Sequence, residues 1–100
     1  MVLKAVFSKI GAMRYISHLD LMRLFQRSAR RSGIPVTITQ GFSPHLKLSI
    51  ERALKLGVES RNERATFYLS QQVDPGEFAR RMNAHLPDDI QILEAKEVIQ

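Results

Sequence analysis

The sequence predicts an α+β protein, a ferredoxin-like sandwich in which two helices cover one face of an antiparallel sheet. Short apolar segments with strand-like alternation lie near both ends and in the middle of the chain. Two other segments carry apolar residues at helical spacing. Together these segments follow the order β-α-β-(β)-β-α-β, and right-handed crossovers then place both helices on the same face. A length of 100 residues fits a single domain over 1–100.

The first strand and helix are defined by alternation and by capping residues. Residues 2–8 alternate between apolar and mixed positions, as in a strand buried on one side. Ser17 is a suitable N-cap for a helix that runs to about Ser32, where Gly33 and Pro35 end it. The helix is expected to pack on the sheet through one apolar stripe: Leu21, Met22, Phe25 and Ala29.

The second half repeats the pattern. Asp74, Pro75 and Glu77 form a strong helix start, and Pro87 ends that helix. The remaining elements are strands over 35–39 and 46–51, an irregular connection over 52–62, a clear strand over 63–71 and a final strand over 90–99.

Composition excludes several classes of protein. The chain has no cysteine, so it offers no disulfide, zinc thiolate site or cysteine-ligated iron–sulfur cluster, and we expect no metal and no cofactor of its own. No apolar run approaches the roughly 20 residues of a membrane span. The apolar segment at residues 1–7 is too short and too interrupted by other residues for a secretory signal. We therefore expect a cytoplasmic protein without membrane contact.

The net charge of +5 is unevenly distributed. Residues 1–64 contain 12 lysines and arginines against four acidic residues, whereas residues 65–100 contain three against six. A basic first part beside an acidic last part favours a surface that faces a polyanion. A solvated surface without a partner is the alternative.

The first helix carries the strongest basic signal. Arg23, Arg27 and Arg30 fall within roughly 60° of each other on a helical wheel, with Arg31 nearby. Like charges at this spacing repel, and Asp20 is the only local acid. This face is expected to bind phosphate or an acidic partner.

The loop 40–47 is a second candidate. Gly41 permits unusual backbone angles, and Pro44 stiffens the turn. We expect Phe42 to cover the core, with base stacking as the alternative. His45 and Lys47 beside it are potential phosphate or base contacts.

Histidine chemistry is only weakly indicated. His18, at the helix start, is expected to be packed and hydrogen-bonded, and His85, beside the second apolar stripe, is expected to be structural. The sequence contains no nucleophile motif, phosphate-binding glycine loop or histidine pair at metal spacing. His18 and His45 remain weak catalytic candidates.

Several stretches of the sequence resemble a known bacterial family. They are RYISHLDLMR at 14–23, RRSGIP at 30–35, QGFSPHLKLS at 40–49 and LGVES at 56–60, followed by Glu63. These stretches are similar to the radical SAM-linked protein family, a domain of unknown function. The resemblance implies association with radical SAM enzymes, as neighbour or fusion, but no established activity. Members are usually longer, so the chain is expected to be an N-terminal part.

We therefore expect an accessory domain, not active by itself, that holds rRNA or tRNA for a partner radical SAM enzyme. The residues expected to contact RNA are Arg14, Arg23, Arg27, Arg30, Arg31, Phe42, His45 and Lys47. One alternative is a metal-independent RNA-processing enzyme using His18 or His45, with Lys47 or Arg14 stabilising phosphate charge. The other is a protein-docking domain without nucleic-acid contact.

Overall fold

A computed structural model describes residues 1–52 and 55–99. Within them the chain forms a four-stranded sheet, two α-helices and one short 3₁₀ helix. In chain order the elements are β1 (Val2–Lys9), η1 (Gly11–Tyr15), α1 (His18–Ser32), β2 (Leu48–Ile50), β3 (Ser60–Tyr68), α2 (Pro75–Asn83) and β4 (Ile92–Val98).

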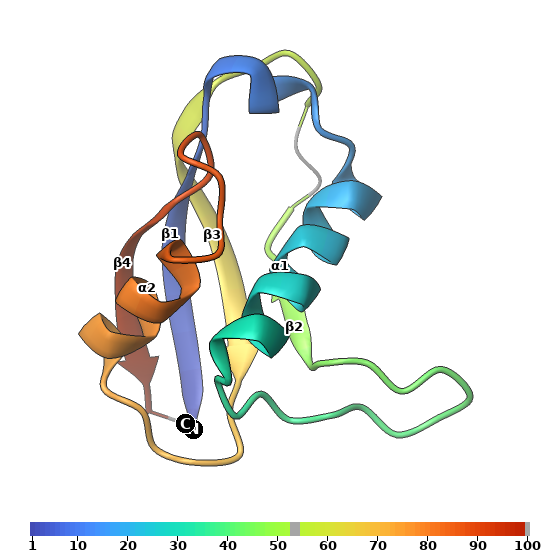
Figure 1. Cartoon of the computed structure of the whole chain (residues 1–100), viewed down its shortest axis with the longest axis vertical. Coiled ribbons are helices and arrows are strands. Elements are labelled where there is room, and N and C mark those ends of the chain that lie inside the picture. The colour runs from blue at the N-terminus through green and yellow to red at the C-terminus, as the bar shows by residue number, and fades with distance from the viewer. Residues whose placement is uncertain (53–54, 100) are drawn as a thin grey trace.

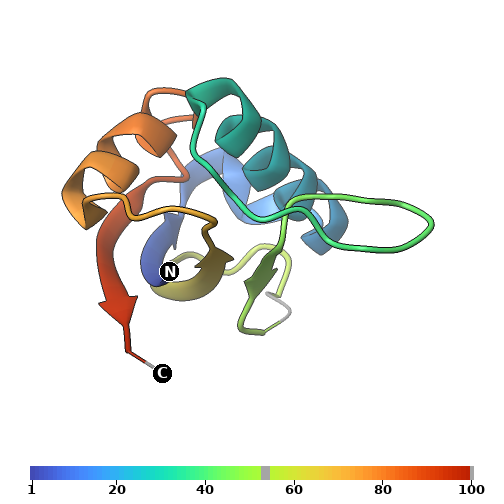
Figure 2. The ribbon, with the colours of Figure 1, turned by 90° about the horizontal axis from the view of Figure 1, so that it is seen from below.

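The sheet has the strand order β2-β3-β1-β4, with every neighbouring pair antiparallel. Leu3 lies opposite Phe67 and Ala5 opposite Ala65 in the central pair. Both helices lie on one face of the sheet, in front of it in Figure 1 and above it in Figure 2. The predicted α+β sandwich of ferredoxin-like arrangement is confirmed.

The core lies between the sheet and the helices. Four buried rings form a row of edge-to-face contacts, with centroids 5.0 Å apart for Phe7 and Phe25, 5.9 Å for Phe25 and Phe67, and 4.9 Å for Phe67 and Phe78. The rings come from β1, α1, β3 and α2, so the row joins the two central strands to both helices. The predicted apolar stripe of α1 is buried at Leu21, Phe25 and Ala29, whereas Met22, at its edge, is only half-buried.

The predicted bounds of α1 and the predicted start of α2 are confirmed, whereas α2 ends at Asn83, before Pro87, because the residues after it form a turn in which the His85 amide donates to the Met82 carbonyl at 3.0 Å. The Ser17 hydroxyl accepts from the Asp20 amide at 3.1 Å, and the Asp74 carboxylate accepts from the Glu77 amide at 3.0 Å. Gly33 ends α1 with a φ of 70°, in the left-handed region where a side chain is disfavoured. Capping signals read from the sequence therefore fix where both helices begin.

The predicted strand over 35–39 is wrong. Only two isolated pairs form in this region, Val36 with Leu69 and Ile38 with Leu46. Because β2 occupies the sheet position next to β3, this segment meets β3 only where that strand ends. Beyond that point it pairs with residues 45–47 instead, and residues 36–47 form an extended arm that projects from the body of the molecule (Figures 1 and 2).

Other predicted bounds shift by a few residues. β4 covers 92–98 of the predicted 90–99, because the Ile90 amide donates to the Pro87 carbonyl in a turn. The predicted connection over 52–62 is shortened by β3, which begins at Ser60, and its residues 53 and 54 lie outside the described residues. Neither α1 nor α2, the helices of the described part of the chain, is long and apolar enough to cross a bilayer.

Two charged side chains are buried at the end of the sheet, Lys9 and Glu63. Arg52 donates to the Glu63 carboxylate through Nη2 at 2.9 Å and Nε at 3.3 Å, and the Lys9 ammonium donates to the Lys55 carbonyl at 3.3 Å. Burial lowers the pKa of Lys9. Burial also raises the pKa of Glu63, but hydrogen bonds from Arg52 and Ser60 and the charges of Arg52 and Lys9 outweigh it, so this pKa lies below its ordinary value.

Candidate nucleic-acid interface

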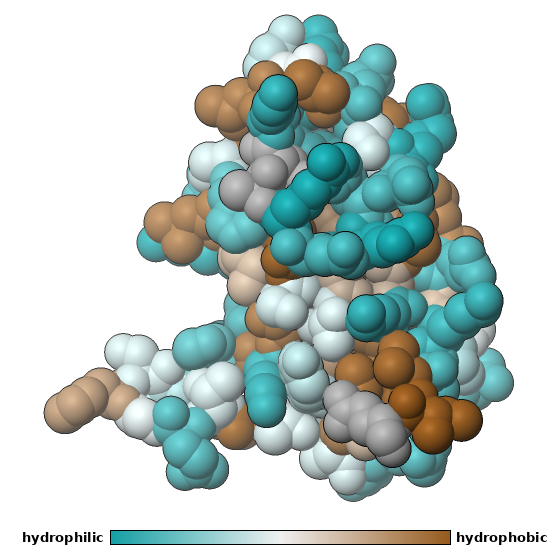
Figure 3. Space-filling model, turned by 180° about the vertical axis from the view of Figure 1, so that it is seen from behind, coloured by the Kyte–Doolittle hydropathy of each residue, from teal (hydrophilic) through white to brown (hydrophobic). Residues whose placement is uncertain are grey.

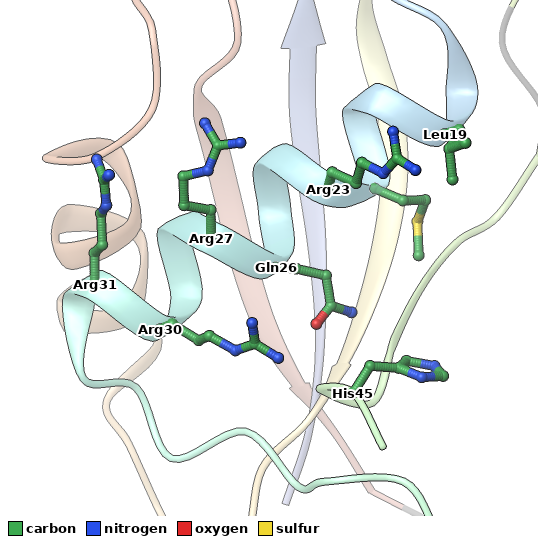
Figure 4. Close-up of a pocket in the computed structure, with 8 residues that line it drawn as sticks. Leu19, Arg23, Gln26, Arg27, Arg30, Arg31 and His45 are labelled. Atoms are coloured by element: carbon green, nitrogen blue, oxygen red, sulfur yellow. The ribbon is translucent and has the colours of Figure 1, made fainter. Parts of the chain in front are cut away.

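A groove of about 660 Å³ runs along the exposed side of α1 (Figure 4). One residue of the arm, His45, also lines it. Its lining combines basic, amide and apolar side chains. The lining residues are Leu19, Met22, Arg23, Gln26, Arg27, Arg30, Arg31 and His45. The structure thus brings together five of the eight residues that the sequence predicts for nucleic-acid contact.

The packing of α1 explains why its arginines line this groove. Leu21, Phe25 and Ala29 are buried against the sheet, so residues on the opposite side of the helix face solvent. Figure 4 shows the arginines spaced along that side. At 1.5 Å per residue, Arg23 and Arg31 stand about 12 Å apart along the axis. This spacing gives an extended row of positive charge.

Few carboxylates neutralise this row. Arg23 lies 3.5 Å from Asp20, but both side chains are more than 60% exposed, so solvent screens the pair. Within residues 1–52 and 55–99, the other three groove arginines have no carboxylate at ion-pair distance. By contrast, Arg80 on α2 pairs with Glu77. The groove therefore presents cationic groups that are available to an external anion.

The arm is fixed to α1 by a residue that the sequence analysis missed. The Gln26 side chain donates to the Leu46 carbonyl at 2.7 Å and accepts from the Leu46 amide at 3.0 Å. This pair fixes the backbone next to His45, which lines the groove. The position of Gln26 about one turn from both Arg23 and Arg30 was a usable signal, because those residues share one helix face.

His45 has a defined orientation in the arm. Its Nδ1 lies 2.9 Å from the Ser43 carbonyl oxygen and 3.3 Å from the Thr39 hydroxyl. A carbonyl oxygen only accepts, so the neutral ring carries its proton on Nδ1 and keeps Nε2 as an acceptor. The imidazole can thus bind a donor when neutral and an anion when protonated.

Three predicted contact residues lie outside the groove. Arg14 in η1 donates to the Gly11 carbonyl at 2.7 Å and stacks over the Tyr15 ring at 4.4 Å. The Lys47 ammonium stands 4.4 Å from the centroid of the Tyr68 ring. Neither residue lines the groove.

The third such residue, Phe42, is fully exposed near the tip of the arm. The expectation that it covers the core is wrong, because the arm extends away from the sheet and the helices (Figure 2). The ring therefore makes no contribution to the buried core.

The expectations for the other histidines are also wrong. His18 is exposed at the first residue of α1 and does not line the groove, so it does not share that site with His45. The His85 side chain is exposed, and the residue contributes its backbone carbonyl, which accepts from the buried Ser28 hydroxyl at 3.2 Å. Among the described residues no group of three acidic, cysteine or histidine side chains could hold a metal ion.

The fold and the groove define a small α+β domain with an arginine-lined helix face suited to an anionic partner. The chain belongs to a family of uncharacterised proteins conserved in bacteria, DUF2344, which it matches over residues 3–100. No curated protein and no solved structure matches it. The family match does not itself connect the chain with radical SAM enzymes.

Proposed function

We propose that this domain binds RNA through the groove along α1 and acts as an accessory module, not as an enzyme by itself. The observation that supports this proposal is the row of four arginines in one groove, three of them without an internal ion pair among the described residues. Guanidinium groups bind phosphate oxygens through charge-assisted hydrogen bonds. The RNA phosphate backbone supplies such oxygens at regular intervals.

The proposed partner is a radical SAM enzyme that acts on a cytoplasmic rRNA or tRNA. The support for this partner is the resemblance of the stretches 14–23, 30–35, 40–49 and 56–60 to the radical SAM-linked family. A chain without cysteine has no thiolate ligand for an iron–sulfur cluster, so the partner supplies the cluster. Capture of the tagged protein from its native cells, before and after ribonuclease treatment, tests this partnership. Recovery of a radical SAM enzyme is expected, and its absence under both conditions contradicts it.

The binding proposal is tested by measuring the affinity for structured RNA across a salt series. Each phosphate contact contributes about −0.7 to −0.9 to the slope of log K against log salt, so four arginines predict a slope of about −3. An affinity for RNA that does not change with salt concentration would contradict the proposal. Copurification of an acidic protein with no RNA affinity would instead favour the docking alternative.

The position of His45 favours one enzymatic alternative. His45 lines the same groove as the arginines, and its Nε2 is an acceptor. The imidazole therefore has the chemistry of a general base beside groups that bind phosphate. RNA cleavage by the purified domain that disappears in His45→Ala would support this alternative. RNA that stays intact with the wild-type protein would count against it.

A further inference from the structure

The side chain of Phe42 has no role in the fold. Among residues 1–52 and 55–99 it is the most exposed large hydrophobic residue, and it does not belong to the core cluster or pack against it. The arm projects at the lower left of Figure 3, and its outermost atoms are hydrophobic. Removing a phenylalanine ring from water is favourable, so a ring presented to water in this way is a ready contact for a partner.

The arm that carries this ring is held by several hydrogen bonds. Near its tip, the Thr39 amide donates to the His45 carbonyl at 2.7 Å and the His45 amide donates to the Thr39 hydroxyl at 3.1 Å. Closer to the body, the Lys47 amide donates to the Thr37 carbonyl at 2.6 Å, and Gln26 binds Leu46. The ring is thus presented by an ordered support, which reduces the entropy lost on binding.

The arm also connects the ring to the basic groove. His45 lines the groove, and Phe42 lies three residues before it on the same arm. Gly41, next to the ring, has a φ of 139°, and a Cβ built there meets no atom within 4 Å. The space around the tip is therefore open to a ligand that continues from the groove.

We propose that Phe42 stacks on an unpaired base and that the domain selects RNA with a single-stranded segment, an inference that rests on the proposed function. A base inside a duplex shows its faces only to its neighbours, whereas an unpaired base offers a face to an aromatic ring. Side chains do not read the deep, narrow major groove of an RNA duplex, so α1 contacts the backbone only. One strand then lies along the arginines and places a base on the Phe42 ring.

The test compares two RNA probes, a short single strand and a blunt-ended duplex of the same sequence. Phe42→Ala is expected to weaken single-strand binding about 5- to 150-fold, the range that loss of one stacked base implies, and to leave duplex binding unchanged. Phe42→Trp is expected to bind the single strand about as tightly as the wild type, because it keeps an aromatic ring. Phe42→Leu is expected to bind it as weakly as Phe42→Ala. The salt slope stays at its wild-type value in Phe42→Ala, because no phosphate contact is removed.

The outcomes separate this inference from the function on which it rests. Unchanged single-strand affinity in Phe42→Ala, or an equal loss for both probes, overturns the stacking role while RNA binding by the groove stands. If the wild-type protein binds neither probe, the proposed function fails as well. Quenching of a fluorescent base analogue in the single strand by wild-type protein, but not by Phe42→Ala, supports the stacked geometry directly.

Discussion

The side chain of Gln26 binds both backbone groups of Leu46, donating to its carbonyl at 2.7 Å and accepting from its amide at 3.0 Å. This contact joins the helix that carries the arginines to the arm that carries His45 and Phe42. It makes the groove and the arm one unit, although 20 residues separate the two partners.

Gln26→Ala is therefore expected to loosen the arm. The buried Leu46 would lose partners for both of its backbone groups, and leaving such groups unsatisfied costs about 1–3 kcal/mol. We expect faster hydrogen exchange at the Leu46 amide and weaker RNA binding. Gln72→Ala, which removes an exposed glutamine elsewhere, is the control and is expected to change neither property. An unaltered exchange rate in Gln26→Ala would refute the link.

Arg27→Ala and Arg80→Ala form a matched pair, because each removes one positive charge from an exposed position of a helix. Arg27 lines the groove, whereas Arg80 is paired with Glu77 on α2. Arg27→Ala is expected to weaken RNA binding and to reduce the salt slope by about 1. Arg80→Ala is expected to leave both unchanged. Equal losses in the two variants would point to net charge instead of the groove.

Replacement by alanine is expected to affect stability strongly at Phe25 and hardly at all at Phe42. Phe25 is fully buried between the Phe7 and Phe67 rings, so Phe25→Ala is expected to cost about 3–5 kcal/mol of unfolding free energy. Phe42→Ala is expected to change that free energy by less than about 0.5 kcal/mol, because its ring is exposed. Urea denaturation measures both. A large loss in Phe42→Ala would show that the arm packs on the core.

The lowered pKa of Glu63 predicts that the stability of the fold depends on pH. A carboxyl group whose pKa is lowered by folding stabilises the fold above its unfolded pKa, and this contribution is lost as the pH falls through the lower, folded pKa. The difference in unfolding free energy between wild type and Glu63→Gln should be large at neutral pH and shrink in acid. The exposed pair of Glu77 and Arg80 provides the control, since solvent screening leaves Glu77→Gln a much smaller effect. A difference independent of pH would contradict this account.

The layers of the fold were predictable because they depend on local signals. Alternation in β1, the stripe of α1, and the caps at Ser17 and Asp74 each act within a few residues of the chain. The strand over 35–39 was not predictable, because its alternation suits a strand and only the sheet order shows that β2 takes that place. When two segments compete for one edge of a sheet, the residues of neither segment show which of them will pair there.

In the candidate site, too, the features that depend on local signals were predictable and those that depend on tertiary arrangement were not. The arginine row of α1 follows from helical periodicity alone, and the groove contains all four residues. Burial of Phe42 and His18 was expected from residue type and wheel position, but both are exposed. The arm projects because residues 36–39 and 45–47 pair with each other, a tertiary arrangement that composition does not encode. The role of Gln26 likewise depends on where that arm returns to the helix.

The most direct test of RNA binding by the groove is a titration of isotope-labelled protein with single-stranded RNA, followed by NMR chemical shifts. The account predicts that the largest changes fall on the exposed side of α1, at Arg23, Arg27 and Arg30, and on His45 in the arm. Largest changes on the sheet face away from the helices, at Lys4, Arg64 and Lys96, would contradict it.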